Sequence, residues 1–272
     1  MPELPEVETA RRGISPHIVG KTIAGIEVRQ SKLRWPVPVN KLRKLVGETL
    51  VSVERRGKYL LLTTHQSGTI LVHLGMSGSL RICGDEEPPA FHDHVDLDFE
   101  DGTRLRYTDP RRFGCWLWAG GLPETHELLV KLGPEPLSEA FDTAYLYAKS
   151  RNRKSNIKQF IMDSHVVVGV GNIYANEALH LSGIHPKRAA GRIAKARYGL
   201  LVENIKKVLA QAIEQGGTTL KDFVGGDGKP GYFKQQLRVY GRGGEPCMTC
   251  QEPLTEIRLG QRTTVFCKFC QT

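Results

Sequence analysis

Four cysteines near the carboxyl end of the chain constrain its fold more than any other feature. They follow the pattern Cys247-x2-Cys250-x16-Cys267-x2-Cys270. Two CxxC pairs at this separation can place four thiolates at the corners of a tetrahedron, which is the geometry of a structural zinc site. Disulfide bonds are the alternative, and a reducing cytosol disfavours them. We therefore predict one Zn²⁺ with no open position for water, which makes it structural rather than catalytic.

The rest of the sequence is typical of a globular cytoplasmic protein. No apolar run approaches the roughly 20 residues that a membrane-spanning helix needs. The first residues, MPELPEVETARRG, lack the apolar segment of a signal peptide. We expect a monomer in the cytoplasm without a membrane partner. Cys83 and Cys115 stand alone, and we interpret them as small buried apolar residues rather than a disulfide pair.

All of the excess positive charge lies in the second half of the chain. The net charge is +9, yet residues 1–150 contain 19 Lys and Arg against 20 Asp and Glu. Residues 151–272 contain 19 against 9, a balance of +10. Such an asymmetry indicates a polyanionic partner and favours nucleic acid over a membrane surface, because no amphipathic basic helix stands out.

The first half has the pattern of antiparallel strands. Residues 95–99 and 103–107 alternate apolar and polar side chains around the turn pair Asp101-Gly102, which predicts a hairpin. Further short strands are predicted at 51–53, 59–63 and 70–74, and together they indicate a two-layer β-sandwich. A helix is expected before them, at about 3–13, beginning at a proline and ending at Gly13.

The second half has helical periodicity. The sequence pattern changes from strand-like to helical at Leu132-Gly-Pro-Glu-Pro136, where we place a linker. An apolar stripe then predicts a helix that ends at Gly216-Gly217, and it is formed by Leu200, Leu201, Ile205, Val208, Leu209, Ala212 and Ile213. The glycine-rich stretch 216–231 that follows is expected to be a functional or disordered loop.

Residues 168–174, Val-Gly-Val-Gly-Asn-Ile-Tyr, lead into another predicted helix. Glycines before a helix N-terminus let backbone N–H groups approach an anion, and the helix dipole favours negative charge there. No Walker-type lysine follows, and no acidic residue stands where a dinucleotide-binding fold would need one. A phosphate of a DNA backbone is therefore the favoured ligand.

The amino terminus offers a nucleophile. Removal of Met1 would free the secondary amine of Pro2, which titrates near 8 and is far less protonated at neutral pH than lysine. Attack of such an amine on a sugar C1′ gives an iminium ion, and Glu3 is placed to move the proton. Ordinary capping of a helix by proline and glutamate is the alternative interpretation of the same residues.

Taken together, the motifs resemble one family, bacterial formamidopyrimidine-DNA glycosylase, also called 8-oxoguanine DNA glycosylase. The similarity runs nearly from end to end, in order, through PELPEVET at 2–9, RRGKYLL at 55–61, HLGMSGSL at 73–80, YTDPRRFG at 107–114, GVGNIYANE at 169–177, GGTTLKDF at 216–223, DGKPGYF at 227–233 and the CxxC pairs. The PELPE and RRF segments favour this branch over endonuclease VIII, which prefers oxidised pyrimidines.

The resemblance implies an α+β fold. It consists of an N-terminal helix with a two-layer antiparallel β-sandwich (1–132), a helical helix–two-turn–helix domain (137–230) and a four-cysteine zinc finger on a β-hairpin (235–272). It also implies a bifunctional DNA glycosylase and AP lyase that removes 8-oxoguanine and formamidopyrimidines from duplex DNA through a Schiff base. The 216–231 stretch would close over the flipped base.

Specific residues carry the implied chemistry. Pro2 would be the nucleophile, Glu3 the acid that opens the sugar and Lys58 a phosphate contact that assists proton transfer. We interpret Arg55 and Arg56 beside it as solvated charges. Glu6 and Glu177 match carboxylates of the family, although plain capping or salt bridging would also account for them.

Other matches concern the DNA. Base extrusion leaves a hole in the duplex that side chains must fill. The resemblance assigns this to Met76, Arg111 and Phe113, of which Met76 and Phe113 would otherwise be interpreted as core. The matched DNA contacts are His92, Arg111, Asn172, Tyr240 and Arg262, and Arg262 would also donate the proton for δ-elimination. His92-Asp-His94 is not expected to bind a metal.

The principal alternative belongs to another class, a noncatalytic zinc-ribbon protein that binds damaged DNA. It predicts equal DNA binding by a Pro2→Gly variant and no strand cleavage by either form. A third possibility keeps the enzyme but shifts its preference toward oxidised pyrimidines.

Overall fold

The computed structural model describes residues 2–66, 68–217 and 236–272. The chain divides into two compact units. Unit 1 comprises Met1–Lys131 and Gln215–Tyr232, and unit 2 comprises Leu132–Glu214 and Phe233–Thr272. Most of the predicted 216–231 loop lies outside the described residues. Among the helices that the structure describes, none has the length and apolar character needed to cross a bilayer.

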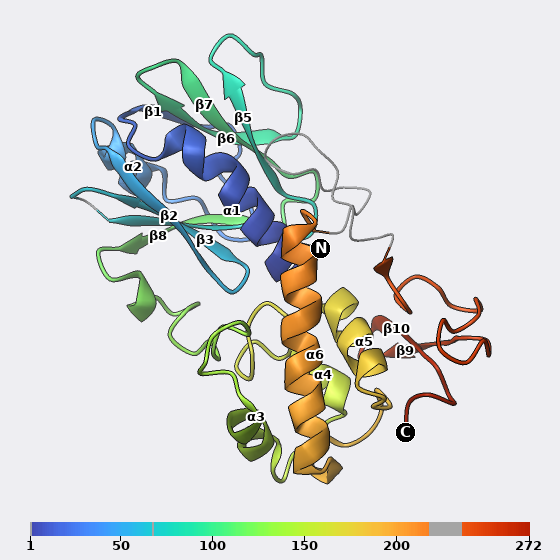
Figure 1. Cartoon of the computed structure of the whole chain (residues 1–272). Helices are drawn as coiled ribbons and strands as arrows, with labels where there is room; N and C mark the ends of the chain where they lie inside the picture. The colour runs from blue at the N-terminus through green and yellow to red at the C-terminus, as the bar shows by residue number, and fades with distance from the viewer. Residues whose placement is uncertain (1, 67, 218–235) are drawn as a thin grey trace. The chain divides into compact units, whose positions relative to one another are not determined.

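Unit 1 contains two four-stranded antiparallel sheets (Figure 1). One sheet has the order β1-β6-β7-β5, from Ile23–Val28, Asp93–Phe99, Thr103–Thr108 and Ser79–Gly84. The other has the order β2-β3-β4-β8, from Leu50–Arg56, Tyr59–Thr64, Thr69–His73 and Cys115–Gly120. The predicted sandwich, its hairpin at 95–107 and the three further strands are confirmed.

The hairpin of β6 and β7 buries both of its faces. Leu97 and Leu105 are opposite each other and point into the apolar core, as the alternation predicts. On the other face, Asp96 and Arg106 are also fully buried, and their side chains form an ion pair at 2.9 Å. Two paired hydrogen bonds let these charges leave water together, since the guanidinium fork matches the carboxylate.

Helix α1 (Leu4–Ile18) contacts strands of both sheets, as Figure 1 shows. The predicted end at Gly13 is wrong, because the helix continues through Pro16. Ile14 and Ile18 are fully buried in this last part. Burying two such side chains contributes about 1.5–3 kcal/mol each, which offsets the costs of a mid-helix glycine and proline.

Short helical turns complete unit 1. They are α2 (Val39–Leu42) and two 3₁₀ turns, Arg43–Leu45 and Pro123–Thr125. Of the two isolated cysteines, Cys115 is buried as predicted, and burial raises the pKa of its thiol to about 12. Cys83 is only partly buried, so that prediction is wrong for it. It lies in β5, whose side chains are largely half-exposed.

Unit 2 contains helices and one hairpin. Its elements are α3 (Thr143–Ser150), α4 (Ile157–Met162), α5 (Asn172–Leu181), a 3₁₀ turn (Ala190–Arg192), α6 (Lys195–Glu214), β9 (Thr255–Leu259) and β10 (Arg262–Phe266). Helix α5 packs on α6 and also on β10, so that the helices and the cysteine-bearing hairpin share one unit.

The predicted apolar stripe of α6 is confirmed with one exception. Leu201, Ile205 and Leu209 are buried, whereas Leu200 is 51% exposed. At about 100° per residue, Leu200 lies on the side of α6 opposite the stripe that Leu201, Ile205 and Leu209 form. Tyr198 and Val202 occupy that face instead.

Candidate functional site

Pro2 is buried in unit 1. Pro2 precedes Glu3, the N-cap of α1, and the proline of the helix's first turn is Pro5. Glu3 and Glu6 are 2% and 0% exposed, and the Glu3 backbone N–H donates to Glu6 Oε2 at 2.9 Å. Capping therefore accounts for Glu6 but not for Pro2, which lies outside the helix that it was expected to begin.

A second carboxylate of α1 organises the turn that carries Lys58. Glu8 accepts hydrogen bonds from Arg11, Arg12 and Arg55. Burial opposes its charge, but these bonds outweigh burial and lower the pKa of Glu8 to about 2.

Arg55 is therefore not the solvated charge that the sequence analysis expected. Its side chain is 13% exposed. It also donates to the carbonyl oxygen of Gly57, the residue before Lys58. No local sequence signal pairs Arg55 with Glu8, because the partners are 47 positions apart.

Lys58 lies in the turn between β2 and β3 and is partly exposed. Its charge acts on His73 at the end of β4. Burial and the nearby Lys58 lower the pKa of His73 to about 4, which keeps the imidazole neutral at physiological pH. His73 Nδ1 accepts the backbone N–H of Gly75 at 2.9 Å and so fixes the start of the loop that carries Met76. The sequence analysis did not single out His73.

The three predicted void-filling residues lie on two loops that pack against each other. Gly75 has a φ of +65°, and a Cβ there would overlap the backbone of Phe113 and Gly114. Phe113 is 43% exposed, and the Arg111 guanidinium carbon lies 4.9 Å from the centre of its ring. Phe113 is therefore not a core residue, which was the interpretation of this position without the family resemblance.

Buried Asp109 fixes both loops. Its carboxylate accepts hydrogen bonds from the Ser77 hydroxyl at 2.9 Å, the Tyr107 hydroxyl at 3.0 Å and the Gly114 N–H at 2.9 Å. Burial, followed by the charge of Asp109, raises the pKa of Tyr107 well above its ordinary value, so this hydroxyl stays a donor. The Asp109 carboxylate thus holds the loop of Met76 and the loop of Arg111 together, and charge-assisted hydrogen bonds replace the water that the charge has lost.

His92, the remaining DNA contact predicted in unit 1, is partly buried. Its Nδ1 is buried without a hydrogen-bond partner among the described residues. The neighbouring His94 is committed elsewhere, because its Nε2 lies 2.8 Å from the Asp109 carbonyl oxygen.

In unit 2, Asn172 is the first residue of α5, after the N-cap Gly171. Its side-chain Oδ1 is buried and has no hydrogen-bond partner in the part of the chain that the structure describes. Asn176, one turn later, accepts the backbone N–H of Val265 at 3.0 Å and so ties α5 to β10. This strand begins with Arg262, which is exposed.

Glu177 positions the segment that carries Tyr240. The Glu177 carboxylate accepts backbone N–H groups of Arg238 at 2.8 Å, Val239 at 3.0 Å and Tyr240 at 2.8 Å. Glu177 is 3% exposed, so these three donors solvate a charge that water does not reach. The side chain therefore acts on backbone amides, an arrangement that neither capping of its own helix nor salt bridging describes.

The four clustered cysteines converge. Their Sγ atoms all lie within 4.8 Å of one another, with Cys250 and Cys267 at 3.4 Å and Cys247 and Cys270 at 4.0 Å. A disulfide needs about 2.05 Å, so these pairs are not bonded. Four sulfur donors at such spacing fit a tetrahedral zinc site. The predicted single structural zinc is supported by this geometry.

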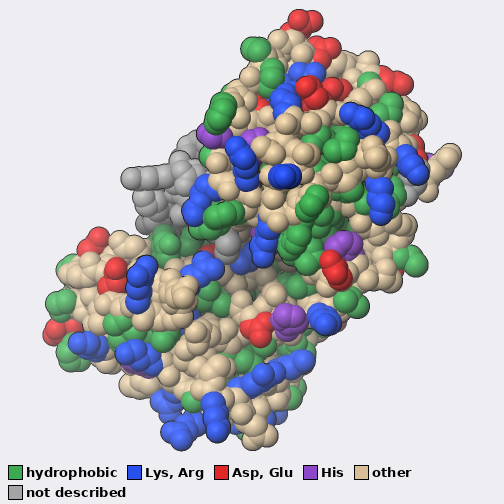
Figure 2. Space-filling view, turned by 180° about the vertical axis from the view of Figure 1, so that it is seen from behind, with side chains coloured by type: hydrophobic (Ala, Val, Ile, Leu, Met, Phe, Trp, Pro, Cys, Tyr) green, Lys and Arg blue, Asp and Glu red, His purple; other side chains and the backbone are tan. Residues whose placement is uncertain are grey.

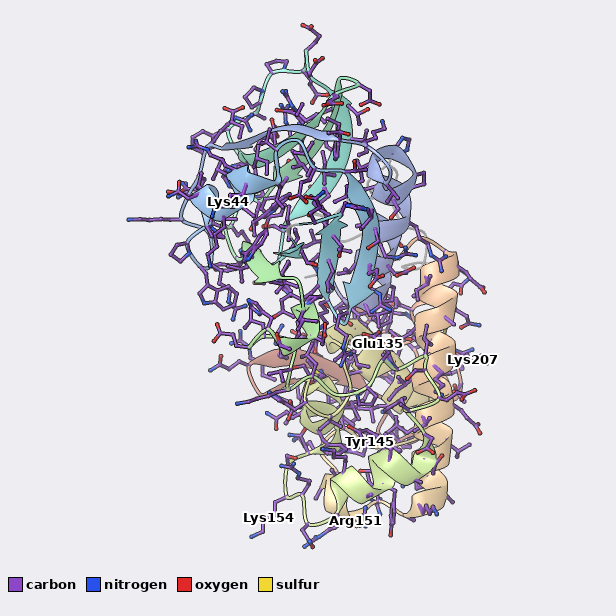
Figure 3. The ribbon with its side chains drawn as sticks, turned by 90° about the vertical axis from the view of Figure 1, so that its left-hand side faces the viewer. Lys44, Glu135, Tyr145, Arg151, Lys154 and Lys207 are labelled. Atoms are coloured by element: carbon purple, nitrogen blue, oxygen red, sulfur yellow. The ribbon has the colours of Figure 1, made fainter. Side chains whose placement is uncertain are left out.

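The predicted site residues thus fall into two sets, one in each unit. Unit 1 holds Pro2, Glu3, Lys58, Met76, His92, Arg111 and Phe113, and unit 2 holds Asn172, Tyr240, Arg262 and the metal ligands. The surface of unit 2 is rich in Lys and Arg (Figure 2). Figure 3 shows Lys154 and Lys207 pointing away from its helices. This surface suits a polyanion such as duplex DNA.

Comparison with known proteins covers the whole chain. Residues 1–116 match the formamidopyrimidine-DNA glycosylase N-terminal domain, 132–224 the H2TH domain of the same proteins and 244–272 a zinc finger found in FPG and IleRS. Formamidopyrimidine-DNA glycosylases of Saccharophagus degradans and Cellvibrio japonicus are 59% and 61% identical, over 100% of each chain.

Solved structures agree. A Lactococcus lactis FPG mutant G226P in complex with a Fapy-dG containing DNA has a TM-score of 0.93 at 34% identity, with 100% of both chains covered. The Lactococcus lactis Fpg in complex with an abasic site containing DNA has a TM-score of 0.92 at 34% identity, with 99% of both covered.

Proposed function

The chain belongs to the formamidopyrimidine-DNA glycosylase family and is a base-excision-repair enzyme that removes oxidised purines from DNA, and on this premise we propose that the amino nitrogen of Pro2 is its nucleophile. The observation that carries the proposal is the position of Pro2, buried beside Glu3 and outside α1. The helix does not need this proline, since Pro5 fills the helix-start position.

The reaction starts with attack of the Pro2 nitrogen on C1′ of the damaged nucleotide. Glu3 donates a proton to the sugar oxygen, the ring opens, the base departs and an iminium ion remains. Elimination of the 3′ phosphate and then of the 5′ phosphate leaves a one-nucleotide gap. Lys58 holds a phosphate and assists proton transfer, and Arg262 donates the proton in the second elimination.

The other assigned residues bind the extruded state. Met76 and Phe113 enter the vacated base step as apolar wedges, and the Arg111 donor fork contacts the orphaned cytosine. His92 and Asn172 contact phosphates through a ring N–H and the side-chain amide NH2, both of which can donate to phosphate oxygens. Tyr240 contacts a phosphate from the segment that Glu177 holds. The zinc stabilises the hairpin that carries Arg262 and takes no part in the chemistry.

We further propose the domain division 1–132, 137–230 and 235–272, and a monomer that acts in the cytoplasm. Duplex DNA is the one partner that this mechanism requires. A single nucleophile and one set of void-filling side chains per chain make a second copy unnecessary.

Borohydride trapping tests the proposal. The enzyme, with removal of Met1 verified by intact mass, is mixed with a duplex that contains 8-oxoguanine and then reduced. We expect a covalent enzyme–DNA adduct, because borohydride reduces the imine to a stable amine. No adduct from the correctly processed protein would refute the mechanism.

The matched control is the same chain with an N-terminal extension. Its Pro2 nitrogen is an amide, so we expect lesion binding to persist while strand cleavage falls on the order of 10³-fold or more. Equal cleavage by both forms would show that another residue is the nucleophile.

A further inference from the structure

Phe91 is the most exposed large apolar side chain among the described residues, at 85%. It lies in the segment between β5 and β6, directly before His92. Single exposed apolar residues are ordinary on protein surfaces, so exposure by itself indicates no function. The surroundings of Phe91 distinguish it from the other exposed apolar residues.

Hydrogen bonds from buried side chains hold the backbone of the segment that ends in Phe91. Fully buried Arg106 donates to the carbonyl oxygens of Pro88 at 3.1 Å and Glu87 at 3.0 Å. Asp93 Oδ2 accepts the Ala90 N–H at 2.8 Å. A ring that is held on a fixed backbone loses little conformational entropy when it binds, which is the advantage of preorganisation.

Arg81 reinforces this arrangement. Its guanidinium pairs with Glu87 at 3.0 Å and with Asp93 at 2.9 Å, so it links the two ends of the segment. The ionic network is half-exposed at Arg81 and Glu87 and buried at Asp93, so it joins the surface segment to the interior of the sheet.

A hollow of about 320 Å³ lies beside the Phe91 ring. Its lining includes the Phe91 ring, the cationic side chains of Arg29 and Arg112 and the carboxylate of Asp93. Arg112 is exposed, and no ion pair is found for it among the described residues. An aromatic face next to an arginine is the combination that binds a nucleoside and its phosphate, through stacking and charge.

His92, the residue after Phe91, is one of the proposed phosphate contacts. The Phe91 and His92 rings meet edge to face, with centroids 4.8 Å apart and planes at 70°. His92 Nδ1 is buried and has no hydrogen-bond partner in the described part of the chain. A phosphate bound by His92 would place the adjoining nucleoside next to the Phe91 ring.

We propose that Phe91 is a further DNA-binding residue, whose ring packs against the nucleoside adjoining the phosphate that His92 contacts. This inference rests on the proposed function, since it requires that His92 binds DNA. It adds an aromatic contact, on a preorganised segment of unit 1, to the cationic and void-filling residues already assigned.

Affinity for an uncleavable duplex, with a tetrahydrofuran abasic analogue, tests the contact. We expect Phe91→Ala to raise the Kd at least about fivefold and Phe91→Tyr to keep it within about twofold, because stacking requires the ring. Leu122→Ala is the matched control, since Leu122 is a 63% exposed apolar residue of the same unit, and its Kd should not change. Thermal melting verifies that each variant is folded.

The outcomes are distinguishable. If the wild-type protein binds the analogue no tighter than undamaged duplex, the proposed function fails. If the wild type discriminates and Phe91→Ala binds equally well, the inference about Phe91 is wrong.

A second readout follows the ring directly. In a Phe91→Trp variant, titration with the same duplex should quench the indole emission beyond the change seen in Leu122→Trp. An unchanged emission would show that the ring stays in water when DNA binds, and would leave a protein partner as the better explanation for its exposure.

Discussion

The sandwich of unit 1 and the cysteine module of unit 2 hold their functional side chains by different physical means. The sandwich has an extensive apolar core that combines α1 with both sheets. Among the described residues, the module's own core consists of Val239, Cys247, Leu254, Val265 and Cys267, with Cys270 against it. A metal site can contribute on the order of 10 kcal/mol, which is what a module with so little apolar burial needs.

The two units also use charge differently. In unit 1, several arginines form ion pairs with buried carboxylates, as Arg106 does with Asp96 and Arg81 with Asp93. In unit 2, the excess cations face solvent, as Figure 2 shows. Internal pairing fixes loops, whereas unpaired surface charge attracts a polyanion over distance. The excess positive charge of unit 2 therefore indicates a polyanionic partner, whereas the arginines of unit 1 are balanced by carboxylates and do not appear in the net charge.

Removal of the metal should have the largest effect and should separate the two regions. We expect Cys267→Ser to weaken DNA binding at least about 100-fold, because the loss of one thiolate unfolds the module. The sandwich should melt as before. Calorimetry and duplex binding provide the measurements, with Cys83→Ser as the control. Loss of both regions together would show that they do not fold by independent means.

Glu177→Gln should have the next largest effect. The glutamine side chain has one acceptor oxygen where the carboxylate has two, so it cannot accept the backbone N–H groups of Arg238, Val239 and Tyr240 together. A buried donor is then left without an acceptor, at a cost of about 3 kcal/mol. We expect DNA binding to weaken about tenfold, while helix α6 stays folded. The exposed Glu203→Gln is the control, and equal affinity of the two variants would exclude a positioning role for Glu177.

The pH dependence of folding stability tests the surroundings of His73 in unit 1. Its folded-state pKa of about 4 lies below the ordinary 6.5, because burial and Lys58 disfavour the cation. The unfolded chain therefore binds the proton first, and stability should fall as pH drops from about 6.5 toward 4, by about 3 kcal/mol.

His73→Asn keeps an acceptor for Gly75 and should flatten this part of the pH profile. Denaturant unfolding between pH 4 and 7 measures it, with the exposed His65→Asn as the control. If the His73→Asn profile follows the wild type, the imidazole is not held neutral by its surroundings.

The smallest expected effect concerns the exposed charge of unit 2. Arg262→Gln should reduce the slope of log K against log salt by about 0.9, the value for one phosphate contact. Lys44→Gln, an exposed residue of unit 1 labelled in Figure 3, should leave the slope unchanged. Equal slopes for both variants would contradict the assigned contact. Binding to an uncleavable duplex keeps catalysis out of the measurement.

Much of the fold could be predicted because its signals are local. The alternation at 95–107 and the CxxC spacing each depend on residues close in sequence, and both predictions are confirmed. The end of α1 could not be predicted, because the burial of Ile14 and Ile18 overrides Gly13 and Pro16. The partly exposed Cys83 and the exposed Leu200 have the same explanation, since exposure depends on what packs against a residue.

The candidate site shows the same division. The sequence by itself determined which residue types are available: a processable Pro2, an adjacent acid, four thiols, glycines before a helix and a basic second half. Only the tertiary structure decided what each one touches. Arg55 meets Glu8, Asp109 joins two loops, and Glu177 binds the 238–240 backbone. Such contacts join residues far apart in the chain, and their energies come from burial and hydrogen bonds that form only when the units are folded.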